Sequence, residues 1–156
     1  KCGKGTRVAH KIEGGKNETF SFRLPSGTEV VFSEASGKES VTITAATGAK
    51  MALDGEGKKI LVTDKDGKNA LTMDLGSGAV TVQADKKLTL SAGTNASITL
   101  DGASGKITVN GKTGVDIQTA QLKAEASGTC QIKANGQMSV ESSGMTQVKG
   151  SMLKLN

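Results

Sequence analysis

Short segments in which two apolar residues flank one residue, usually polar, recur along the chain. Each predicts a β-strand with one buried face. The middle residue is often Thr, which is β-branched yet polar and suits the exposed side of a strand. The apolar spacing of an amphipathic helix is missing. The pattern therefore predicts an all-β protein, with segments at Val41/Ile43, Met51/Leu53, Ile60/Val62, Leu71/Met73, Val80/Val82, Leu88/Leu90, Ile98/Leu100, Ile107/Val109, Val115/Ile117, Leu122/Ala124, Cys130/Ile132, Met138/Val140, Thr146/Val148 and Leu153/Leu155.

The spacing of these segments changes along the chain. In the first part they form a repeated pair, because residues 37–54 align with residues 57–74. From Leu100 onward the second apolar position recurs at close to every eighth residue, and Gly128, Gly136 and Gly144 keep the same period. An eight-residue repeat excludes the hexapeptide left-handed β-helix, but it leaves open a right-handed solenoid made by one chain.

Turn dipeptides separate many of the segments. They fit either the sharp corners of a wound chain or the hairpin turns of a meandering sheet. A flat sheet with one apolar face would be insoluble without a cover, and the sequence offers no helix to cover it. We therefore expect a wound chain whose apolar stripe faces the inside of a prism, with corners at Asp54-Gly55, Asp66-Gly67, Asp101-Gly102, Asn110-Gly111 and Asn135-Gly136.

The composition agrees with a fibre or a solenoid. Hydrophobic residues make up 35% of the 156 residues, aromatic residues make up 2%, and Trp and Tyr are absent. Phe20, Phe22 and Phe32 all lie in the first fifth of the chain, so a compact globular core is not expected after residue 33. Regular β-branched spacing and a single Pro argue against disorder.

The charge pattern indicates a solvated outer surface. The formal net charge is +5, but Lys residues alternate with acidic ones, as in residues 64–68. A nucleic-acid-binding protein would instead cluster its Lys and Arg on one face. We therefore expect no nucleic-acid partner.

Candidate catalytic and metal-binding groups are sparse. His10 is the single His and lies in irregular sequence, so no Ser/His/Asp set is expected, and we interpret His10 as a linker residue. Gly3-Lys4-Gly5-Thr6 is not followed by a helical pattern, which argues against a phosphate loop. Cys2 and Cys130 form no metal-like pair, and Cys130 is expected to be a small buried residue of a strand. The sequence predicts no enzyme, no cofactor, no metal, no membrane span and no signal peptide.

Residues 22–156 resemble a known family. Eight-residue repeats with Gly at the corners, preceded by the segment Phe22–Phe32 (FRLPSGTEVVF), resemble the central spike proteins of contractile tails. These include the cell-puncturing spikes of phages, tailocins and extracellular injection systems, and the valine-glycine repeat spikes of type VI secretion. Residues 25–28 (PSGT), followed by Gly37-Lys38 and residues 41–44 (VTIT), look most similar to the tailocin or injection-system branch.

The resemblance implies an elongated, intertwined, triple-stranded β-helix formed by a homotrimer. In such a triangular prism each strand crosses one face before the chain turns to the next. A chain returns to the same face about 14 Å higher, so its own strands are too far apart to pair and the other two copies fill the gaps. Fourteen strand layers then give a rod of about 65 Å.

These expectations divide the chain into two regions. Residues 1–24 are expected to be a linker or the end of a preceding hub-attachment domain, and residues 25–156 are expected to be the needle. The predicted trimer core consists of Val41, Ile43, Met51, Leu53, Ile60, Val62, Leu71, Met73, Val80, Val82, Leu88, Leu90, Ile98, Leu100, Ile107, Val109, Val115, Ile117, Cys130, Ile132, Met138, Val140 and Val148.

The resemblance also implies partners at both ends. Met152, Leu153, Lys154, Leu155 and Asn156 are expected to bind a conical tip protein with Pro-Ala-Ala-Arg repeats. An equally weighted interpretation makes the two leucines the last layer of the core. An apex metal in this family is held by closely spaced histidines, which this end of the chain does not have.

The implied function is a spike that transmits force and pierces the envelope of a target cell, with transient contact to its membrane. The baseplate hub and tube are the expected partners at the N-terminal end. We therefore expect the protein to be assembled in the cytoplasm of the producing cell. Its final place would be the baseplate tip of a virion-like or extracellular particle. The alternative is a β-solenoid adhesin or fibre stalk without a piercing role, for which exposed aromatic residues or a distal binding domain are expected.

Overall fold

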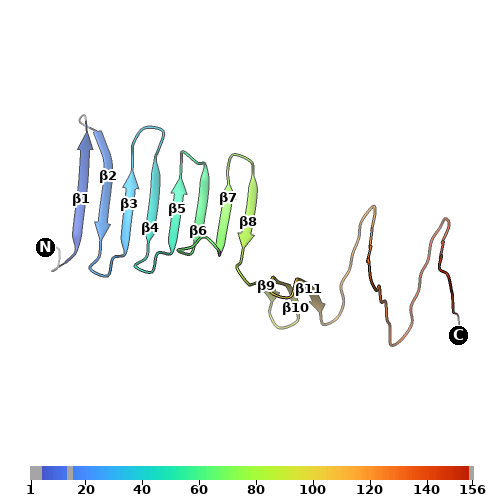
Figure 1. Ribbon diagram of the computed structural model, residues 1–156. Helices are drawn as coiled ribbons and strands as arrows, with labels where there is room; N and C mark the ends of the chain where they lie inside the picture. Colours follow the sequence, from blue (N-terminus) through green and yellow to red (C-terminus); the bar gives the residue numbers. More distant parts are fainter. Residues whose placement is uncertain (1–4, 14–15, 155–156) are drawn as a thin grey trace. The chain divides into compact units, whose positions relative to one another are not determined.

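The computed structural model describes residues 5–13 and 16–154 and confirms that the chain is all-β. The described residues form strands and no helix (Figure 1). The strands are β1 (Arg7–Glu13), β2 (Lys16–Arg23), β3 (Glu29–Ser33), β4 (Ser40–Thr44), β5 (Lys50–Asp54), β6 (Lys59–Thr63), β7 (Ala70–Asp74), β8 (Ala79–Gln83), β9 (Lys87–Ala92), β10 (Ala96–Asp101) and β11 (Lys106–Gly111).

The strands form two antiparallel sheets in which chain neighbours are also spatial neighbours. The larger sheet, called sheet A, has the order β1-β2-β3-β4-β5-β6-β7-β8, and the smaller, sheet B, has the order β11-β10-β9. Figure 1 shows β1 to β8 side by side in a single row. The pairing of β2 with β3 continues across the boundary expected at residues 24–25, so β1 and β2 belong to the same sheet as β3 to β8.

The register of sheet A places its apolar residues on one face. Side chains alternate between the faces of a strand, and residues directly opposite each other in a ladder share a face. Val62 is opposite both Met51 and Leu71, and Ile60 is opposite both Leu53 and Met73. The two apolar positions of each strand therefore build two continuous columns along the sheet. One contains Val8, Phe22, Val30, Ile43, Met51, Val62, Leu71 and Val82, and the other contains His10, Phe20, Phe32, Val41, Leu53, Ile60, Met73 and Val80.

The turn dipeptides of this part of the chain lie in hairpin loops, which corrects the expectation of prism corners at Asp54-Gly55, Asp66-Gly67 and Asp101-Gly102. The expectation that the strands of one chain would be too far apart to pair is likewise wrong for residues 7–111. The physical reason is that each loop is long enough to reverse the chain and return it to the neighbouring ladder position. Loop residues 55–58, for example, connect Asp54 to Lys59, which lie opposite each other.

After β2, hairpins occur wherever at least six residues separate the facing apolar residues that close them. Between Leu53 and Ile60, for example, one strand residue on each side and a four-residue loop make up the six residues 54–59. The other closing pairs are separated by seven, eight, seven, eight, six, seven and six residues, at 23–29, 33–40, 44–50, 63–70, 74–79, 91–97 and 101–106.

Shorter connections lead to segments that do not pair with the preceding strand. The five residues 83–87 separate Val82 from Leu88, and here the chain passes from sheet A to sheet B. The five residues 110–114 separate Val109 from Val115, where sheet B ends. Every later connection also has four or five residues, at 118–121, 125–129, 133–137, 141–145 and 149–152.

The chain divides into two units, Lys1–Val115 and Asp116–Asn156, and the described part of the second, residues 116–154, has no strand and no helix. Figure 1 shows it as an extended trace that changes direction repeatedly. The hydrogen bonds within this described part are local ones, such as that from the Gly144 backbone N–H to the Ser142 hydroxyl (3.1 Å). Its expected strand positions therefore have an extended backbone whose donors and acceptors have no ladder partner among the described residues.

Candidate assembly interface

The chain by itself exposes far more surface than a folded monomer of its mass. Its solvent-accessible area is 13428 Å², whereas a compact monomer of 15.9 kDa has about 7,400 Å². The difference of about 6,000 Å² is several times the roughly 800 Å² that one partner buries in a standard protein interface. Among the described residues only Ala52 is buried, at 5% exposure.

The two apolar columns of sheet A contribute to this exposed surface. Most of their side chains are exposed, at 42% for Ile43, 49% for Leu53 and 61% for Val80, whereas Val30, Val41 and Ile60 are half-buried. The least exposed position of the sheet lies on the opposite face, where Ala52 sits between Thr42 and Leu61. The face with the larger apolar side chains is thus left open to solvent by sheet A.

The aromatic residues gather at the β1–β3 end of this face. The rings of His10 and Phe20 meet edge to face with centroids 6.2 Å apart, and Phe20 and Phe32 are also 6.2 Å apart. His10 therefore lies in a strand, opposite Phe20, rather than in a linker as the sequence suggested. Five further residues of this face lie outside the predicted core, although Phe20/Phe22 and Val30/Phe32 have the same apolar spacing as the later segments. These residues are Val8, Phe20, Phe22, Val30 and Phe32.

Sheet B has the same one-sided arrangement of apolar residues as sheet A, with fewer strands. Ile98 faces Leu90 on one side and Val109 on the other, and Leu100 faces Leu88 and Ile107. These side chains are also exposed, at 55% for Leu90 and 68% for Ile107. Sixteen of the predicted core residues thus lie in sheets A and B, each within a one-sided apolar ladder: Val41, Ile43, Met51, Leu53, Ile60, Val62, Leu71, Met73, Val80, Val82, Leu88, Leu90, Ile98, Leu100, Ile107 and Val109.

The remaining predicted core residues lie in the extended part of the chain. Cys130 is a free, exposed thiol in a segment without ladder hydrogen bonds, which differs from the expected buried strand position. The others are Val115, Ile117, Ile132, Met138, Val140 and Val148, with exposures from 50% for Met138 to 80% for Ile132.

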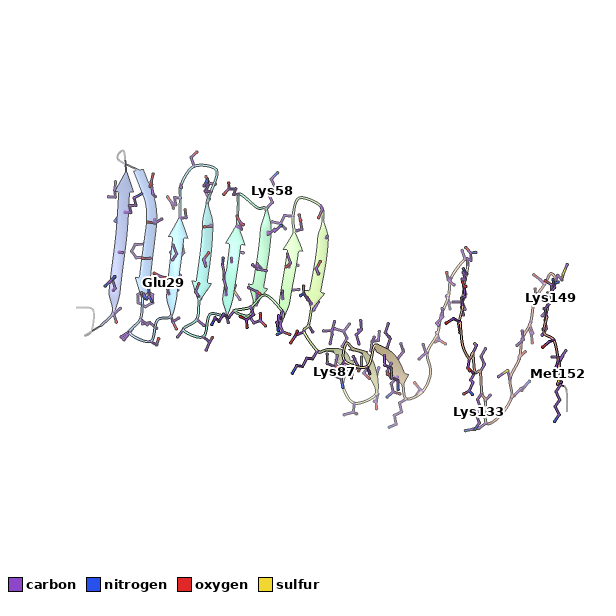
Figure 2. The ribbon with its side chains drawn as sticks, viewed as in Figure 1. Glu29, Lys58, Lys87, Lys133, Lys149 and Met152 are labelled. Carbon is purple, nitrogen blue, oxygen red and sulfur yellow. The ribbon has the colours of Figure 1, made fainter. Side chains whose placement is uncertain are left out.

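The predicted tip-binding residues are only partly described. Met152 is 86% exposed and Leu153 is 62% exposed, and Figure 2 shows Met152 projecting from the extended trace. Lys154 is exposed as well. Leu155 and Asn156 lie outside the described residues.

The opposite face of both sheets is mostly polar, although it includes Val31, Ala52 and Leu61 in sheet A, and its charges alternate across the ladders. Asp101 lies opposite Lys87 on one side and Lys106 on the other, and Lys59 lies opposite both Asp54 and Asp74. Cross-strand pairs of opposite charge are weakly stabilising, whereas like charges in these positions would repel. This face has the composition of a solvated surface.

Aspartates at the strand ends organise several hairpin loops. The Asp74 carboxylate accepts hydrogen bonds from the backbone N–H groups of Gly76 (2.9 Å) and Ser77 (3.0 Å). The Ser77 hydrogen bond is the main reason that the pKa of Asp74 lies below its ordinary value of 3.8. Hydrogen bonds from Ser104 lower the pKa of Asp101 in the same way, and the hydrogen bond from the Asn69 side chain is the main cause that lowers the pKa of Asp64.

The described residues contain neither a metal-binding cluster nor a helix that could span a membrane. No three His, Cys, Asp or Glu side chains are grouped so that they could hold a metal ion. Within residues 5–13 and 16–154 there is also no helix of the length and apolarity needed to cross a membrane.

Comparison of the sequence with models of known protein families and with curated proteins finds no match.

Proposed function

We propose that three copies of this chain associate into a rod that serves as the force-bearing spike of a contractile injection machine. The apolar faces of sheets A and B turn inward and form a dry core. The polar faces turn outward to solvent. The observation that carries the proposal is the pair of continuous apolar columns along sheet A, which the chain itself leaves uncovered.

The dimensions of the strands favour three copies. A strand of five residues, such as β5 to β8, is about 17 Å long. A triangle with sides of about 17 Å has its centre about 5 Å from each side, which is half of the roughly 10 Å that separates two packed sheets. Two apolar residues per strand from each face can therefore fill the space around a threefold axis without a cavity.

The extended segment 116–154 needs other copies for a different reason. Its backbone groups have no ladder partner within the chain, and a strand with two open edges is not stable alone. In the proposed rod each pass crosses one face and is paired on both edges by passes of the other two copies. The intertwined β-helix is thus proposed for residues 116–154, whereas residues 7–111 form hairpin-built faces.

This arrangement fits the transmission of axial force. The hairpin sheets link successive layers within one chain, and the intertwined passes link all three chains in every layer. No short segment can then detach without breaking the pairing of its neighbours. The seventeen layers made by eleven strands and six further passes would span about 80 Å, longer than the 65 Å expected from fourteen layers, because β1 to β3 add three.

The proposed role in a contractile injection machine rests on the resemblance of residues 22–156 to contractile-tail spikes. The N-terminal end would join the baseplate hub and tube. Met152 to Asn156 would receive a tip protein with Pro-Ala-Ala-Arg repeats, and the spike would contact the target membrane only transiently. The assembled protein would lie at the baseplate tip of a particle built in the cytoplasm of the producing cell.

The test begins with the molar mass of the purified chain, measured by light scattering after size-exclusion chromatography. We expect the mass of three chains, an elongated hydrodynamic shape and resistance to sodium dodecyl sulfate before boiling. A monomer would overturn the proposed assembly. If the protein is a trimer, immunogold labelling of contractile particles tests the spike role, and labelling of cell-surface fibres instead would favour the fibre stalk.

A further inference from the structure

We propose that the free edge of β8 in one copy pairs with the free edge of β9 in a neighbouring copy, in parallel orientation. This inference rests on the proposed trimer, and it names the strands that join the copies. The chain would cross from one face of the rod to the next between β8 and β9, well before the extended segment begins.

The length of the connection between β8 and β9 supports a crossing to another face at this point. The hairpins that follow β2 have six to eight residues between their closing apolar residues. The β1–β2 hairpin is tighter, with Ile12 opposite Asn17, and has no apolar pair at its closing position. Val82 and Leu88 are separated by only the five residues 83–87. The chain does not use this connection as a hairpin, because β8 and β9 belong to different sheets. The connection has the same length as 110–114, which leads into the extended passes.

The free edges of β8 and β9 carry matching residues on both faces. The apolar residues Val80 and Val82 of β8 have their equivalents in Leu88 and Leu90 of β9. On the polar face, Thr72 lies opposite Thr81 at the end of sheet A, and Thr89 lies opposite Thr99 at the start of sheet B. Joining β8 to β9 therefore continues the apolar columns on one face and the Thr column on the other. It also satisfies the backbone groups that both edges leave unpaired.

Hydrogen bonds and an ion pair hold the connection between β8 and β9 in place. The backbone N–H of Asp85 donates a hydrogen bond to the Asn69 side-chain oxygen (3.0 Å), and the Asp85 carboxylate lies 3.9 Å from the Lys68 ammonium. The backbone N–H of Gly102 donates to the Lys86 carbonyl (2.8 Å). Residues 84–86 are thus held by the β6–β7 loop and by the β10–β11 loop.

Threefold symmetry determines the orientation of the new pair. All copies travel around the axis in the same direction, so β9 of one copy enters the face on which β8 of the neighbouring copy lies and runs in the same sense. The two strands are therefore parallel. The inter-copy pair differs in this from every pairing within sheets A and B, which are antiparallel.

Cysteine cross-linking tests the proposal. In the full chain carrying Cys2→Ser and Cys130→Ser, the double variant Thr81→Cys plus Thr89→Cys places one thiol on each edge of every copy. Oxidation, or a short bismaleimide that also spans the diagonal neighbours about 7–8 Å apart, would link each β8 to the β9 of the next copy. We expect a closed covalent trimer on a denaturing, non-reducing gel.

A matched control uses Thr72→Cys plus Thr81→Cys in the same background. These positions face each other within one chain, so cross-linking should give only covalently monomeric bands. The mass of each variant before cross-linking separates the two proposals. A trimer whose Thr81/Thr89 variant yields only monomeric bands with both reagents would overturn the β8–β9 pairing and leave the trimer intact. A monomer would overturn both.

Discussion

Met73 and Val80 lie directly opposite each other in the β7–β8 ladder, and both are open to solvent, at 40% and 61% exposure. A cross-strand apolar pair normally contributes to stability by burial against a second layer. Here the second layer is missing within the chain. The proposed partner copies would supply it.

The first prediction concerns this pair. Val80→Asp should convert the trimer to monomers or to misassembled protein, because three unpaired carboxylates would be buried near the axis. Each would cost several kcal/mol. Thr81→Asp is the matched control, since Thr81 is the next residue of the same strand and lies on the polar face. Light scattering should give the trimer mass for Thr81→Asp only. Trimers of equal stability for both variants would contradict the inward orientation of the apolar face.

The second prediction concerns the loop between β5 and β6. Lys58 is the only non-glycine among the described residues with a positive φ, at 48°, and the equivalent position of the β7–β8 loop is Gly78, at 72°. The left-handed region costs a residue with a Cβ roughly 1–2 kcal/mol. Lys58→Gly should therefore raise the free energy of unfolding by up to about 1 kcal/mol, and the reciprocal Gly78→Lys should lower it by a similar amount. Denaturant titration of both variants measures these changes in the free energy of unfolding. A destabilised Lys58→Gly variant would show that the Lys58 side chain makes a contact that stabilises the fold by more than its backbone conformation costs.

The strands from Val41 to Val109 were predictable because alternation of apolar and polar residues is a local property. Each of the eight segments predicted there is a strand in the structure, from β4 to β11. The partner of each strand could not be predicted from this alternation, because a hairpin and a wound chain have the same alternation of apolar and polar residues. The length of the connection carries that information. Residues 54–59 lead to a hairpin, whereas residues 83–87 lead to another sheet.

The residue types in the turns could not make this distinction. Asp101-Gly102 lies at a hairpin turn, whereas Asn135-Gly136, which is an equally strong hairpin signal, lies in the extended segment. Both glycines allow the backbone to change direction, but neither determines by how much. The pairing of residues 116–154 depends on strands that are proposed to come from other copies, so no pattern within one chain could reveal it.

The third prediction concerns pH. Hydrogen bonds from Asn69, Ser77 and Ser104 lower the pKa values of Asp64, Asp74 and Asp101 below 3.8 in the folded chain. The unfolded chain therefore takes up protons first as the pH falls. The stabilisation from these carboxylates is fully present above about pH 4 and is lost as the pH falls through their folded pKa values. Unfolding midpoints measured between about pH 6 and pH 2 should fall with pH. The fall should be shallower in the triple variant Asp64→Asn, Asp74→Asn and Asp101→Asn.

Asp66→Asn is the control for the pH series. It removes a carboxylate from the same loop as Asp64 without removing the hydrogen bonds that Asp64 accepts from the backbone N–H groups of Lys68 (2.9 Å) and Asn69 (3.1 Å). Its pH profile should remain parallel to that of the unmodified chain. Equal slopes for the triple variant and the unmodified chain would show that the loop carboxylates do not determine acid stability.

The fourth prediction separates the two regions by their dependence on assembly. Pairing in residues 7–111 comes from the chain's own neighbouring strands, whereas residues 116–154 have no backbone ladder of their own. Amide hydrogen exchange should therefore be slow throughout the trimer. In the Val80→Asp variant, exchange should be fast in residues 116–154 and slower in β3 to β7, where local hairpins remain. Thr81→Asp, which should stay trimeric, provides the reference pattern. If residues 116–154 were protected in a monomeric variant, or unprotected in the trimer, the intertwined pairing proposed for them would be wrong, because protection there requires strands that a single chain does not supply.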